Sequence, residues 1–101
     1  MITAALLVLV LTGCGSIAQR GEPVKVVASI APLADWARRV GGEHVAVELI
    51  VPPGLDPRTY EPAPRQRAAM ENADIVLMNG LGVEPWIEEI LEHPSNDQLI
   101  V

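Results

Sequence analysis

The stretch of sequence that decides the fold is residues 24–51, VKVVASIAPLADWARRVGGEHVAVELIV. It begins with a β-branched run, residues 24–29, of the kind that forms a buried strand. Pro32 suits the first turn of a helix, and the glycine pair 41–42 suits a helix end. A second apolar run, residues 45–51, predicts another strand. The stretch therefore predicts a strand–helix–strand unit, the building block of a parallel sheet.

The predicted helix carries one apolar stripe. Four apolar residues follow the spacing i, i+3, i+4 and i+7, namely Leu33, Trp36, Ala37 and Val40. This spacing places them on one face of a helix. We expect that face to pack against the sheet.

The same alternation continues along the chain. Pro64 opens a second predicted helix, and residues 74–79 form a third strand. A third helix is predicted to start near Glu84, and residues 97–101 form the beginning of a fourth strand. Strands alternating with helices predict an α/β fold, a parallel sheet with helices on both faces. Because the sequence stops inside an apparent strand, residues 24–101 are interpreted as an incomplete lobe of a longer protein.

Ligands bind such sheets at the carboxyl ends of the strands. The irregular stretch 52–63 follows the second strand, so it lies at such an end. It is long for a connection inside a compact domain, and long irregular connections are usually functional. Residues 52–63 are therefore the candidate binding loop.

Composition and charge exclude several classes of protein. Thirteen acidic against seven basic residues give a formal net charge of −6, which disfavours a nucleic-acid partner because phosphate binding needs a basic face. Half of the residues are hydrophobic, which is too many for a disordered acidic tail. A single cysteine allows no internal disulfide. No arrangement of nucleophile, base and orienting acid is visible, so we do not expect an enzyme.

The first residues, MITAALLVLVLTGC, have the pattern of an export signal. The segment 11–14, LTGC, resembles the lipobox of bacterial lipoproteins, in which cleavage leaves the cysteine as the new N-terminus. We therefore expect residues 1–13 to be a signal peptide and Cys14 to be lipidated. Residues 14–23 then have the composition of a tether. Several acyl chains on Cys14 would hold the exported protein on the extracytoplasmic side of the membrane.

Three segments together resemble the zinc/manganese-binding receptor lipoproteins of ABC-type metal importers. They are residues 27–35, VASIAPLAD; residues 51–64, VPPGLDPRTYEPAP; and residues 79–86, NGLGVEPW. The family pattern in the middle segment is approximately V-P-x-G-x-D-P-H-x-Y/F-E-P-x-P. The resemblance implies a two-lobed periplasmic-binding-type receptor, of which residues 24–101 are part of the N-terminal lobe. It also implies zinc or manganese as the bound ion and an ABC permease in the membrane as the partner.

The sequence departs from this family at one position that matters. The first metal ligand of the family is the histidine after Asp-Pro, and here that position is Arg58. A guanidinium is always cationic and offers no lone pair to a metal. The candidate cleft loop therefore consists of Asp56, Arg58, Tyr60 and Glu61, with no residue assigned as a metal ligand.

The two histidines do not replace the missing ligand. His44 stands at the start of the second strand and His93 near the end of the third helix. We expect exposed structural roles for both.

Two interpretations of Arg58 remain open. Ligands from outside this stretch hold the metal while Arg58 pairs with Asp56 or Glu61, or else the lobe binds an anionic or chelated ligand that Arg58 grips bidentately. A third hypothesis is that the protein is a surface lipoprotein or adhesin of the same fold without metal transport.

Overall fold

The structure, a computed structural model, describes residues 21–92 and 98–101. The expected signal peptide 1–13, Cys14, most of the tether 14–23, and His93 lie outside these residues. Within the described ranges, each helix is too short or too polar to span a bilayer.

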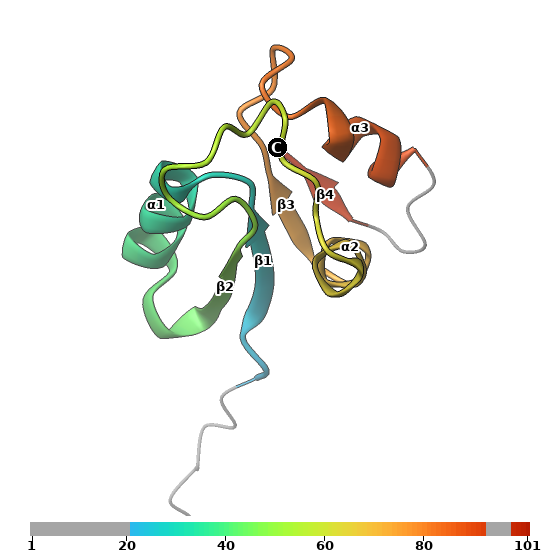
Figure 1. The fold of residues 1–101 in the computed structure, drawn as a ribbon. Helices are drawn as coiled ribbons and strands as arrows, with labels where there is room; N and C mark the ends of the chain where they lie inside the picture. Colours follow the sequence, from blue (N-terminus) through green and yellow to red (C-terminus); the bar gives the residue numbers. More distant parts are fainter. Residues whose placement is uncertain (1–20, 93–97) are drawn as a thin grey trace, which may run out of the picture.

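The centre of the molecule is a four-stranded parallel sheet with the strand order β2-β1-β3-β4 (Figure 1). Its strands are β1 (Val24–Ala28), β2 (Val45–Leu49), β3 (Ile75–Leu77) and β4 (Leu99–Ile100). Val26 of β1 lies in register with Val47 on one side and Ile75 on the other. The prediction of a parallel α/β sheet is therefore confirmed.

Helices connect consecutive strands: α1 (Ala31–Gly41), α2 (Pro64–Glu71) and α3 (Pro85–Leu91), with a short 3-10 turn η1 (Gly42–His44) after α1. The chain moves in one direction from β1 to β2 and in the opposite direction from β2 to β3 and β4. Because crossovers are right-handed, this reversal places α1 on one face and α2 and α3 on the other. The point of reversal lies between β1 and β3, where sheets of this kind form ligand crevices.

The larger part of the core lies between the sheet and the pair α2 and α3. It is a cluster of buried side chains: Val27, Ile50, Val51, Met70, Ala73, Val76, Trp86, Ile87 and Leu91. On β1, Val26 and Ala28 alternate with Val27 and so face the other side, where α1 contributes its fully buried Ala34. Both faces of the sheet are therefore covered, as predicted.

The predicted apolar stripe of α1 is wrong at two of its four positions. Trp36 is 62% exposed and Val40 is 90% exposed. Ala34 is buried, and Leu33, Ala37 and Gly41 are partly buried. A Cβ at Gly41 would lie 2.4 Å from the side chain of Val45, at the start of β2. The side of α1 that packs inward is therefore centred on Ala34, and Trp36 and Val40 lie outside it.

Candidate functional site

The candidate loop leaves the carboxyl end of β2 and crosses the edge of the sheet before α2 begins (Figure 1). The four predicted site residues all lie on it: Asp56, Arg58 and Glu61 are exposed, and Tyr60 is partly buried. A surface pocket of about 340 Å³ is lined by Leu55, Asp56, Thr59, Tyr60 and Glu61. The loop thus presents two acidic residues and two hydroxyl-bearing residues, Thr59 and Tyr60, at the carboxyl edge of the sheet.

Asp56 shapes the loop around position 58. Its Oδ1 accepts a hydrogen bond from the backbone N–H of Arg58 at 2.9 Å, and its carbonyl accepts one from the N–H of Thr59 at 3.3 Å. This is the Asx turn that aspartate favours. Asp56 therefore acts on the backbone of Arg58 and not on its guanidinium.

Arg58 makes no ion pair with Asp56 or Glu61 in the structure. Ion pairs do form elsewhere among the described residues, for example Arg39 with Asp35 at 2.9 Å and Arg65 with Glu48 at 3.8 Å. The pairing expected for Arg58 in one of the two interpretations is thus not formed here. The guanidinium stays exposed and available.

Tyr60 and Trp86 tie the loop to both helices on its side of the sheet. The Tyr60 hydroxyl donates to Gln66 Oε1 on α2 at 2.9 Å. The Tyr60 ring meets the ring of Trp86 on α3 in an edge-to-face arrangement, with centroids 6.1 Å apart. Trp86 Nε1 donates to the carbonyl of Pro57 at 2.7 Å. Trp86 itself belongs to the core, since it is only 8% exposed.

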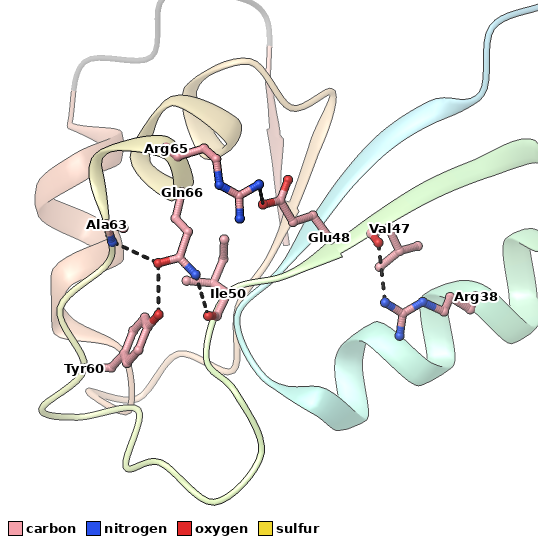
Figure 2. A network of polar contacts seen from close by, with 8 residues as sticks. All are labelled: Arg38, Val47, Glu48, Ile50, Tyr60, Ala63, Arg65 and Gln66. Carbon is pink, nitrogen blue, oxygen red and sulfur yellow. Dashed lines mark hydrogen bonds and ion pairs between the residues drawn. The ribbon is translucent and has the colours of Figure 1, made fainter.

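Gln66 is a site residue that sequence reasoning missed. Its Oε1 also accepts from the backbone N–H of Ala63 at 2.9 Å, and its Nε2 donates to the carbonyl of Ile50 at 2.9 Å (Figure 2). The available signal was its place at the third position of the helix, where Gln often reaches back to the residue before the helix. That residue is Ala63, which has no hydroxyl to complete the pattern, so the signal was weak.

Glu84 is a second residue that sequence reasoning missed. It is 1% exposed and lies just before α3. Its Oε1 accepts from the Ser29 hydroxyl and from the N–H of Asn79 at 2.9 Å, and its Oε2 accepts from the N–H of Gly80 at 3.1 Å. Glu84 therefore joins the carboxyl ends of β1 and β3, at the point where the chain direction reverses.

The metal-ligating side chains are not gathered in this part of the protein. Among the described residues, no group of three or more His, Cys, Asp and Glu could hold a metal ion. His44 is exposed in η1, directly before β2 and at the opposite end of that strand from the loop. The loop itself places the exposed guanidinium of Arg58 at the carboxyl edge of the sheet.

Comparisons with known proteins identify the relatives of this chain. A family model described as the periplasmic component A of a zinc-uptake complex matches residues 26–101. The manganese-binding lipoprotein MntA of Halalkalibacterium halodurans is 35% identical over 96 residues, 91% of this chain and 32% of that protein. The iron ABC transporter substrate-binding lipoprotein MtsA of Streptococcus pyogenes is 33% identical over 97 residues, 89% of this chain and 31% of that protein.

Solved structures show the same fold. The periplasmic zinc-binding protein TroA of Treponema pallidum superimposes with a TM-score of 0.72 at 28% identity, over 78% of this chain and 28% of that one. A ZnuA crystal structure gives a TM-score of 0.70 at 34% identity, over 79% of this chain and 31% of that one. The chain spans about a third of the length of the curated relatives it matches.

The match covers the sheet, its helices and the loop, and it is a match to solute-binding receptors and not to enzymes. The chain belongs to the family of the periplasmic component A of zinc-uptake complexes.

Proposed function

We propose that this chain is the N-terminal part of the extracytoplasmic solute-binding component of an ABC importer for a zinc- or manganese-type metal ion. The observation that carries the proposal is the loop 52–63, which resembles the family's sequence pattern except at Arg58 and lies at the carboxyl edge of the sheet. The partners that follow are a membrane permease and the metal ion as cargo.

The chemistry of the loop defines its part in binding. Imidazole and carboxylate groups suit zinc and manganese, whereas Arg58 repels a dication. We propose that the ligands come from the remainder of the protein and that Arg58 turns away from the bound ion. The exposed carboxylates of Asp56 and Glu61 lie on the same loop and give the guanidinium a place to turn to.

A metal titration of the full-length protein tests this function. We expect calorimetry with zinc and with manganese to show one saturable site for at least one of them. Failure of both metals to bind, in the native protein and after Arg58→His, would contradict the proposed function.

The membrane anchor is a separate proposal, and it rests on the LTGC segment at residues 11–14. In a bacterial host, we expect the mature protein to begin at Cys14 and to partition into a detergent phase. Cys14→Ser should abolish both lipidation and cleavage, because only the thiol can carry the lipid. Mass spectrometry of the mature N-terminus checks this. Retention of Met1, or an unmodified Cys14, would contradict it.

Arg58 also favours a second candidate, a surface lipoprotein or adhesin of the same fold without metal transport. An adhesin needs no ion between its lobes, so the loss of a ligand would cost it nothing. The same titration separates the two candidates, because an adhesin predicts no saturable metal site.

A further inference from the structure

The side chain of Gln66 forms hydrogen bonds with residues at both ends of the candidate loop and within it. Gln66 bonds to Ile50 just before the loop, to Tyr60 within it and to Ala63 at its end (Figure 2). All three hydrogen bonds are 2.9 Å long. In sequence these contacts span from 16 residues before Gln66 to 3 residues before it. A single amide on the first turn of α2 therefore closes the whole loop.

A second contact holds the loop on the other side of position 58. Trp86 Nε1 binds the carbonyl of Pro57, the residue directly before Arg58. The Trp86 ring also contacts the ring of Tyr60, and the Tyr60 hydroxyl donates a hydrogen bond to Gln66. Residues 57 and 60 are thus fixed by two different helices, and Arg58 stands between them.

We infer that Gln66 is a positioning residue that sets the place of residue 58 relative to the edge of the sheet, before any ligand binds. The inference rests on the proposed function only where it concerns metal affinity. The Arg58 side chain forms no hydrogen bond or ion pair with either helix, so the backbone of Arg58 is the part that is positioned. The backbone at position 58 is therefore already fixed when a ligand arrives, whichever side chain it carries.

The chemistry of this contact requires an amide. Gln66 Oε1 accepts two hydrogen bonds while its Nε2 donates one to a carbonyl. Glutamate keeps the two acceptor contacts but turns an oxygen toward the Ile50 carbonyl, which is repulsive. Methionine has a similar length and makes none of the three bonds. Gln66→Glu therefore removes one of the three hydrogen bonds and Gln66→Met removes all three, and neither changes the side-chain volume much.

Hydrogen exchange in the full-length protein tests positioning without any metal. The reporter is the Arg58 N–H, which is bonded to Asp56, and the reference is the Ser29 N–H, which is bonded to the Leu77 carbonyl within the sheet. We expect Gln66→Met to speed exchange at Arg58 about tenfold, the effect of roughly 1.4 kcal/mol, with little change at Ser29. Gln66→Glu should have an intermediate effect. The matched control, Arg67→Met on an exposed neighbouring position, should leave Arg58 unchanged.

Two outcomes of this exchange experiment would overturn the inference. One is unchanged exchange at Arg58 in Gln66→Met. The other is an equal acceleration at Arg58 and Ser29, because that result would mean a general loss of stability and not a local loss of position.

A second experiment, zinc titration of the variants, separates this inference from the proposed function. In an Arg58→His background, Gln66→Met should weaken zinc binding about tenfold, while Arg67→Met leaves it unchanged. A loosened loop with unchanged zinc affinity would overturn the link between positioning and binding. If Arg58→His binds no metal at all, the proposed function fails, and the exchange result alone decides whether Gln66 positions residue 58.

Discussion

Replacing Arg58 by histidine should strengthen zinc or manganese binding by the full-length protein at least about a hundredfold, which corresponds to roughly 2.8 kcal/mol. The change removes a cation and supplies an imidazole nitrogen, a common metal ligand, on the loop that we propose faces the bound ion. At about 4 Å and an effective dielectric near 20, a unit charge and a dication repel each other by roughly 8 kcal/mol. The expected gain is smaller than this because Arg58 is exposed and turns away at little cost.

Calorimetry of native and variant protein measures this effect. The control is Arg67→His, which introduces the same side chain on the exposed surface of α2, away from the loop. It should leave metal affinity within about twofold. Tight binding by the native protein that Arg58→His weakens would show that the guanidinium takes a positive part in ligand binding. That outcome would favour an anionic or chelated ligand.

Glu84→Ala should lower the free energy of unfolding by about 3 kcal/mol, because it leaves a buried hydroxyl and two backbone N–H groups without their acceptor. Removal of a partner from a buried polar group is costly because water does not replace it. The contacts that are lost lie at the carboxyl ends of β1 and β3, which Glu84 connects. Ser29→Ala removes one of the three contacts and should cost about 1 kcal/mol.

Urea unfolding followed by tryptophan fluorescence measures this loss, since Trp86 packs in the adjacent core. The control is Glu88→Ala, an exposed residue on α3, which should change stability by less than about 0.5 kcal/mol. Equal effects of the two substitutions would contradict a structural role for the buried carboxylate.

Local patterns predicted the elements well because each pattern has a short-range cause. β-branched runs favour strands, and proline at the start and glycine at the end delimit α1. The structure places Pro32 and Pro64 in first turns and gives Gly42 a φ of 53° at the end of α1. The second strand ends at Leu49 and not at Val51, although the N–H groups of Ile50 and Val51 still bond to the carbonyls of Ala28 and Ser29.

Periodicity failed where packing distance decided the outcome. The predicted stripe on α1 has the right spacing, and Leu33 and Ala37 are partly buried, but the fully buried residue is Ala34, and Trp36 and Val40 remain outside. The spacing of apolar residues in the sequence does not show how a helix packs on a sheet. The packing depends on the residues that face each other in the fold, for example Gly41 and the side chain of Val45.

The sequence by itself determined the α/β class, the order of the elements and the irregular loop 52–63 with its Arg58. These properties follow from spacing, propensity and the text of a motif, which are local. Only the tertiary structure decided that Gln66 closes the loop and that Glu84 joins β1 to β3. Their partners lie up to 16 and 55 residues away in the chain, and side chains so far apart meet only after the crossovers have brought the strand ends to one edge. In the sequence, Glu84 looks like its exposed neighbours Glu88 and Glu89, because burial is a property of the folded chain and not of the residue.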